Sequence, residues 1–168
     1  MDDLRGHFRL EWILSPVRCL TPTLHLCNRA SPHAFPIRLL TFIHVIRIPV
    51  EIVLLWLYQQ GHIPQLMTDE GRNFDILAGI TAPIMAQVAF RGGYLHKNLL
   101  AFWNVLALGL LLNIVVNAIL SMPTPFQQFA QEQPNVAVFY FPFIWLPAVI
   151  VPIVFFCHLV SLSQLLRK

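Results

Sequence analysis

Charged side chains are scarce in this 168-residue chain: they make up 11% of the sequence, whereas apolar residues make up 57%. Roughly a quarter of the residues in an ordinary soluble domain are charged. The composition therefore excludes an ordinary soluble domain and indicates a protein that faces lipid. The formal net charge is +3, but the basic residues lie between hydrophobic runs, where membrane topology accounts for them. We therefore do not expect nucleic acid as a partner.

Cysteines and catalytic motifs are also few. The three cysteines, Cys19, Cys27 and Cys157, are odd in number, and the last lies in a hydrophobic run, which excludes a disulfide framework. The sequence contains no G-x-x-x-x-G-K-[ST], G-x-S-x-G, H-E-x-x-H or C-x-x-C motif. Nucleotide-binding, serine-hydrolase, zincin and thiol-redox functions therefore lack support. We predict no catalytic residue, no metal site and no cofactor.

Long hydrophobic runs dominate the chain from residue 37 onward. Each has about the length that a helix needs to cross ~30 Å of hydrocarbon. The runs cover residues 39–58, 74–90, 99–120 and 138–160. Prolines and arginines interrupt residues 1–36, so this segment is predicted to be a basic, poorly ordered cytoplasmic tail. The predicted fold is all-α: a four-helix transmembrane bundle over residues 37–168.

The distribution of lysine and arginine predicts the orientation, because cytoplasmic loops are enriched in both. The basic residues on one predicted side are Arg5, Arg9, Arg18, Arg29, Arg38, Arg91, Lys97, Arg167 and Lys168. The connection after the first run contains Arg72 alone, and the connection after the third run contains no basic residue. An even number of spans with both termini in the cytoplasm satisfies all of these positions.

Small residues recur along the second run. Ala78, Ala82 and Ala86 are four residues apart, with Gly79 beside them. Such a stripe allows a neighbouring helix to approach closely, so we expect it to face protein rather than lipid. The stripe also suggests a structural or assembly subunit that binds a membrane-protein partner or a second copy of itself.

Ionisable residues form a stripe on the first run. His44, Arg47 and Glu51 lie within about 60° of one another on a helix, so they share one face. This face is expected to point into the bundle, because a charge in hydrocarbon costs at least ~2.5 kcal/mol. The spacing leaves open whether Arg47 pairs with Glu51 or with Asp75. It also leaves open whether the stripe is a structural ion pair or a binding or proton-relay site.

Further polar residues suggest a pocket in the outer half of the membrane. Asp75 falls in the outer first turn of the second predicted helix, and Asn113 and Asn117 share a face in the outer half of the third. The two asparagines are expected to reach the Arg47 and Glu51 stripe or to act as hydrogen-bonding glue between helices. Asn104 points to the opposite side of the third helix and is left out of this pocket.

Two histidines raise a second possibility. His44 and His158 both fall toward the cytoplasmic side, on the first and fourth predicted helices. They are the candidates for a bis-histidine haem site. No spacing motif accompanies them, so two unrelated buried histidines are the simpler interpretation.

Four stretches of the sequence resemble a family of uncharacterised bacterial multi-pass inner-membrane proteins. They are HVIRIPVE (44–51), MTDEGRNFDILAG (67–79), PFQQFAQEQPN (125–135) and YFPFIWLP (140–147). The resemblance covers residues 39–166 and implies a location in the bacterial cytoplasmic membrane. It also implies that family members begin with further hydrophobic helices, so a shortened or altered start is expected here. It implies no activity.

The sequence thus predicts an integral membrane protein and favours a non-enzymatic role over an enzymatic one. Its leading role is to bind or pass a small polar solute or a proton through the outer-half pocket. The alternatives are a structural or assembly subunit and a haem-binding redox protein that uses His44 and His158.

Overall fold

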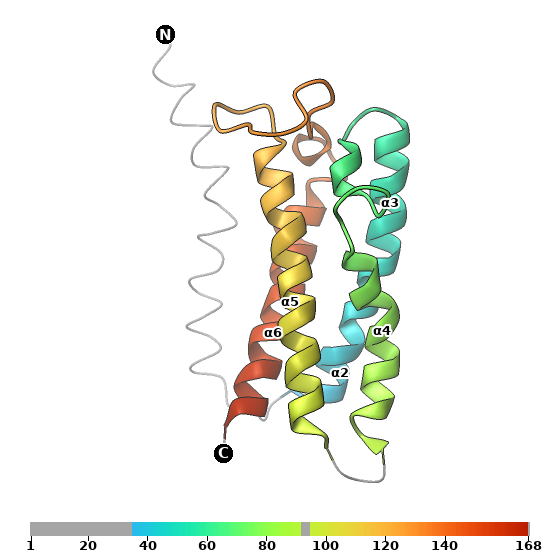
Figure 1. The fold of residues 1–168 in the computed structure, drawn as a ribbon, viewed down its shortest axis with the longest axis vertical. Coiled ribbons are helices and arrows are strands. Elements are labelled where there is room, and N and C mark those ends of the chain that lie inside the picture. Colours follow the sequence, from blue (N-terminus) through green and yellow to red (C-terminus); the bar gives the residue numbers. More distant parts are fainter. Residues whose placement is uncertain (1–34, 92–94, 168) are drawn as a thin grey trace.

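The computed structural model describes residues 35–91 and 95–167, and throughout these ranges the regular secondary structure is helical. Four helical columns lie side by side in an elongated bundle (Figure 1). The predicted all-α, four-helix class is therefore confirmed. The amino-terminal tail was predicted to be poorly ordered over residues 1–36. Residues 1–34 of this tail lie outside the described residues, so this part of the prediction stays a prediction.

The first column is built from three consecutive helical segments: α2 (Ile37–Phe42), the 3₁₀-helix η2 (Ile43–Ile46) and α3 (Arg47–Gln59). Pro49 has no backbone N–H to donate, and it lies in the first turn of α3, where a proline is tolerated. Together the segments form 23 residues that are long and apolar enough to cross a membrane. This agrees with the predicted span at residues 39–58.

The second column differs from the prediction. Helix α4 covers only Asp75–Val88, which is 14 residues, or about 21 Å at 1.5 Å per residue. A hydrocarbon core is ~30 Å thick, so α4 alone is too short to cross it. The candidate membrane spans among the described residues are Ile37–Gln59, Lys97–Leu120 and Leu146–Leu166. The helix expected over residues 74–90 is present as Asp75–Val88, but it is shorter than these three stretches and is not among the candidate spans.

The chain between α3 and α4 descends into the bundle without forming a long helix. It contains a 3₁₀ turn, η3 (Gln65–Met67), and then runs along α5 (Lys97–Leu120). Near the end of α5, the Ser121 hydroxyl contacts Met67 Sδ, and further down the Asn113 side chain donates to Arg72 O. Figure 1 shows this green segment running down to the start of α4.

Helix α4 begins near the middle of the bundle. One nitrogen of Arg47 donates both to Asp75 Oδ1 and to the carbonyl of Ala107, which lies near the middle of α5. Asp75 was expected at the outer end of a complete helix and instead lies at this central depth. The pattern of apolar residues could not reveal this, because residues 68–74 are not helical and occupy the part of the second pass that precedes α4.

The last column begins with the π-helical segment η6 (Leu146–Ile150) and continues as α6 (Val151–Leu166). It begins later and ends later than the predicted span at residues 138–160. Upstream, the chain forms the 3₁₀ turn η5 (Ala137–Phe139) and further turns before η6. No proline or glycine follows Pro152 before Leu166, so nothing stops the helix at residue 160.

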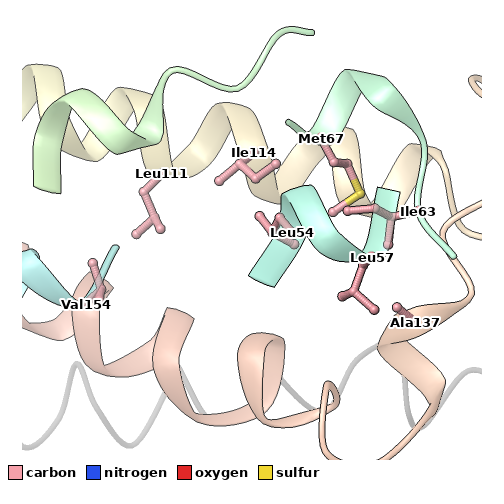
Figure 2. Close-up of a cluster of buried hydrophobic side chains, with 8 residues drawn as sticks. All are labelled: Leu54, Leu57, Ile63, Met67, Leu111, Ile114, Ala137 and Val154. Atoms are coloured by element: carbon pink, nitrogen blue, oxygen red, sulfur yellow. The ribbon is translucent and has the colours of Figure 1, made fainter. Parts of the chain in front are cut away.

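Apolar side chains fill the bundle on both sides of its middle. Toward the end that holds the loop between α3 and α4, side chains from α3, α5 and α6 meet those of Ile63 and Met67 (Figure 2). Toward the other end, the predicted small-residue stripe faces protein as expected: Ala78, Ala82 and Ala86 are at most 2% exposed. A β-carbon at neighbouring Gly79 would lie 2.9 Å from Ile48 Cγ1, so only glycine permits this close approach of α4 to α3.

Candidate functional site: a buried polar cluster

A set of polar side chains lies between the two apolar regions, and we call it the polar cluster. All four columns contribute to it, as does the segment that leads into α4, and each member is at most 5% exposed. Its members are His44, Arg47, Glu51, Asn73, Asp75, Asn104 and His158. Burial of so many polar groups is costly unless they bind one another, so their hydrogen bonds decide what the cluster can do.

Arg47 is the centre of the polar cluster. Its Nη1 donates to Asp75 Oδ1 at 2.9 Å and to the Ala107 carbonyl at 3.0 Å. Its Nη2 lies 2.8 Å from His158 Nε2. The guanidinium therefore joins α3 to α4, α5 and α6, and the question that the sequence left open has an answer: Arg47 pairs with Asp75.

The neighbours of His158 fix which of its ring nitrogens carries the proton. Asn104 Nδ2 donates to the Leu100 carbonyl, so its Oδ1 is the acceptor that faces His158 Nδ1 at 2.9 Å. His158 Nδ1 therefore donates, and Nε2 accepts from Arg47, which can only donate. In this arrangement the imidazole is neutral and both of its nitrogens are bonded.

Glu51 is held by the segment that leads into α4. Asn73 Nδ2 donates to Glu51 Oε1 at 2.5 Å and to the Met67 carbonyl at 3.0 Å. Asn73 Oδ1 accepts from the backbone N–H of Asp75. The other carboxylate oxygen of Glu51, Oε2, is buried and has no hydrogen-bond partner among the described residues.

His44 makes ring contacts rather than hydrogen bonds. Its ring stacks on that of His158 with the centroids 4.0 Å apart and the planes 21° apart, and the Trp103 ring meets it edge-on. Both nitrogens of His44 are buried without a partner in the described part of the chain. A haem held by both histidines would require these stacked rings to separate and His158 to leave Arg47 and Asn104.

The predicted pocket residues Asn113 and Asn117 lie apart from the polar cluster. Asn113 is exposed and donates to the Arg72 carbonyl at 2.7 Å, and Asn117 donates to Asn113 Oδ1 at 3.3 Å. Neither bonds to Arg47 or Glu51 among the described contacts. Their hydrogen bonds connect the segment between α3 and α4 to α5, which is the interhelical hydrogen-bonding role that the sequence analysis considered for them.

Two members of the polar cluster, Asn73 and Asn104, were missed by the sequence reasoning. Helical periodicity correctly separated Asn104 from Asn113, but it did not reveal which of the two faces points inward. A usable signal was present: Asn104 shares its face with Leu100, Ala107 and Leu111, and all four are buried. Asn73 carried only the weaker signal of a polar residue just before a helix.

Comparison with known proteins identifies a family whose function is unknown. The sequence model of a family described as a domain of unknown function (DUF8737) matches residues 10–166. The match includes the described residues of all four columns and every member of the polar cluster. Neither a curated protein nor a solved structure matches the chain.

Proposed function

We propose, from the premise that the chain belongs to the DUF8737 family, that it is an integral membrane protein whose polar cluster binds or passes a small polar solute or a proton. One observation carries the proposal. The buried Arg47–Asp75 ion pair lies beside Glu51 and His44, and one carboxylate oxygen of Glu51 and both ring nitrogens of His44 have no partner among the described residues. A purely structural ion pair does not need these additional unsatisfied groups.

The distribution of side chains supports a place in the membrane. In the part of the chain that the structure describes, three helices are long and apolar enough to cross a bilayer. Large apolar side chains point outward from the bundle, as at Phe102 and Val105 of α5, which are 64% and 57% exposed. At the depth of the polar cluster, the charged groups Arg47, Glu51 and Asp75 are inside and apolar groups are outside, as lipid requires. Combined with the family resemblance, this supports the bacterial cytoplasmic membrane.

The positions of the chain ends support the proposed orientation. Gln164 near the end of α6 donates to the Phe35 carbonyl just before α2, so the described ends lie at the same end of the bundle. Arg38 lies in the first turn of α2 and Lys97 is the first residue of α5, and Figure 1 shows both helices beginning at this end. Both termini are therefore proposed to be cytoplasmic.

The shape of the second pass supports binding rather than structure alone. Non-helical backbone at membrane depth is tolerated where it is buried in protein or lines a cavity. Secondary transporters use such interrupted helices to form substrate and ion sites near the bilayer midplane. Helix α4 begins at mid-bundle beside Arg47, after the non-helical segment, and it has the same arrangement.

Flux measurements on purified protein in lipid vesicles test the proposal. Three probes are used: protons, detected by a trapped pH dye, and the uncharged polar solutes urea and glycerol, detected by light scattering. We expect wild-type vesicles to pass at least one probe faster than protein-free vesicles, and Glu51→Gln to lose that flux. Glu70→Gln, an exposed loop carboxyl, is the matched control and should retain it. Wild-type flux equal to that of protein-free vesicles for all three probes would overturn the proposal.

The structure weakens the observation behind the assembly-subunit alternative. The Ala78, Ala82 and Ala86 stripe that suggested an external partner is covered by the chain's own helices. Stoichiometric co-purification of another membrane protein would still support an assembly role. The haem alternative is tested by the absorption spectrum of the purified protein, in which a Soret band lost in His44→Ala would support it.

A further inference from the structure

Polar atoms without a protein partner follow one another along the inside of the bundle. On the first column they are Glu51 Oε2, Arg47 Nε and both ring nitrogens of His44. Ser161 Oγ on α6 is also buried and lacks a partner among the described residues. We call these groups the unpartnered row. Because they belong to side chains that are at most 5% exposed, solvent at the surface does not satisfy them.

The positions of these groups along the bundle axis are set by helix geometry. Seven residues separate His44 from Glu51, which corresponds to about 10 Å of helix. Ser161 lies one turn beyond His158, whose ring stacks on His44. Since α6 continues to Gln164 beside Phe35, Ser161 lies between His44 and the end of the bundle that holds the chain ends. The unpartnered row therefore runs from the level of Glu51 toward that end.

The spacing of the unpartnered row suits bound water. Two hydrogen bonds of about 2.8 Å that meet at one water molecule with a near-tetrahedral angle span about 4.6 Å, slightly less than the ~5.4 Å rise of one helical turn. Buried polar groups that lack a protein partner are commonly satisfied by internal water with two to four hydrogen bonds. One or two waters between successive groups would give each of them a partner.

The charges of the polar cluster leave one proton uncommitted. Arg47 and Asp75 form an ion pair that is neutral as a whole, and the two bonds of His158 keep its ring neutral. Glu51 and His44 remain. The cluster has zero net charge when one proton resides on Glu51, with His44 neutral. It also has zero net charge when that proton resides on His44, with Glu51 ionised. A net charge buried in a membrane is costly, so these two states are favoured over the alternatives.

We propose that the species passed by the polar cluster is the proton, and that it moves between Glu51 and His44 through water bound along the unpartnered row. This rests on the proposed function and names its substrate. The proton leaves Glu51 Oε2 for a water, each water passes a proton to the next, and the last gives one to a ring nitrogen of His44. The products are a carboxylate and an imidazolium, so charge and atoms balance.

The other groups around the unpartnered row keep fixed roles. Arg47 stays protonated and donates from Nε to water, while Asp75 offsets its positive charge so that it does not repel the moving proton. His158 faces His44 as a neutral ring, and the Trp103 ring flanks both, with its centroid 5.5 Å from that of His44 and 6.2 Å from that of His158. Ser161 Oγ can accept and donate, so it extends the path from His44 toward the proposed cytoplasmic end.

Proton flux in vesicles, driven by a potassium diffusion potential and detected with the trapped pH dye, tests the assignment. Glu51→Gln removes the proton donor, and His44→Phe keeps the stacked ring but removes both nitrogens. We expect both variants to fall to the flux of protein-free vesicles and Ser161→Ala to slow the flux. The matched controls Glu70→Gln and His96→Phe change exposed residues, and Ser163→Ala changes a partly exposed α6 serine. All three should keep wild-type flux.

A second measurement covers the case in which a variant fails to fold. Infrared spectra of the wild-type protein should show the C=O stretch of a protonated buried carboxyl, which Glu51→Gln removes and the control Glu70→Gln retains. Persistence of this band in Glu51→Gln would overturn the assignment. Proton flux that survives both Glu51→Gln and His44→Phe would also overturn it. Flux of urea or glycerol without proton flux would overturn the assignment and leave the proposed function intact, whereas absence of all three fluxes would overturn both.

Discussion

The two carboxyl groups of the polar cluster should be energetically coupled through Arg47. Asp75 and Arg47 form a buried pair 2.9 Å apart, and removing one partner of such a pair typically costs about 3–5 kcal/mol. In Asp75→Asn, however, Glu51 remains on the same helix face as Arg47 and can ionise to balance its charge. We therefore expect Asp75→Asn to destabilise the bundle by about 3 kcal/mol, at the lower end of that range.

The single Glu51→Gln change should cost less than about 1 kcal/mol, because the amide oxygen can still accept from Asn73 and the Arg47–Asp75 pair is intact. In the double variant no carboxylate remains to balance Arg47. Its destabilisation should therefore exceed the sum of the single changes by about 1–3 kcal/mol, the coupling range of residues that share a partner.

The measurement is the free energy of unfolding in mixed micelles that contain increasing amounts of denaturing detergent, followed by circular dichroism. A parallel cycle with Glu70→Gln, an exposed loop carboxyl, in place of Asp75→Asn should be additive. If the Asp75 and Glu51 changes are additive within about 0.5 kcal/mol, the two carboxyls do not balance the charge of Arg47 together. That result would refute the proposal that one proton is shared between Glu51 and His44.

Further predictions concern other contacts of the bundle. His158→Ala leaves two buried polar groups without their partner and should cost about 2–5 kcal/mol in the same unfolding assay; a loss below about 1 kcal/mol would contradict the bonded, neutral ring. Gly79→Ala should be less stable than Gly109→Ala by about 1–3 kcal/mol, because a β-carbon meets Ile48 at the first site and open space at the second; equal stabilities would contradict the close packing of α4. In a cysteine-free background, an impermeant thiol reagent should label Glu70→Cys from the outer side and His96→Cys from the cytoplasmic side, and labelling of both from one side would refute the topology.

The sequence was sufficient for the architecture because hydrophobic length and periodicity determine it. The runs at 39–58 and 99–120 correspond closely to the helical stretches Ile37–Gln59 and Lys97–Leu120. The run at 74–90 has the composition of a span, but composition does not reveal the path of the non-helical residues before it. These residues reach mid-bundle depth through tertiary bonds, as between Asn113 and Arg72, that leave no mark in the local pattern.

Only part of the polar cluster was predictable, because local helical spacing reveals residues that share one helix but not their partners on other helices. One helix face brings His44, Arg47 and Glu51 together, and local spacing is enough to find them. The partners of Arg47 come from distant parts of the chain: Asp75 is 28 residues away and His158 is 111 residues away. Their proximity depends on how the helices are rotated against one another, which is settled by packing such as that at Gly79.

The short 3₁₀ segment Ile43–Ile46 has a geometric consequence for this arrangement. In a 3₁₀-helix, residues three apart eclipse one another, whereas in an α-helix they are offset by about 60°. The tighter winding therefore brings the His44 imidazole almost directly into line with Arg47, where it meets the ring of His158. If the segment relaxed to α-helical winding, His44 would swing toward a neighbouring face by about 60°. One change of helical pitch would then take the imidazole out of line with Arg47 and away from the ring on which it stacks.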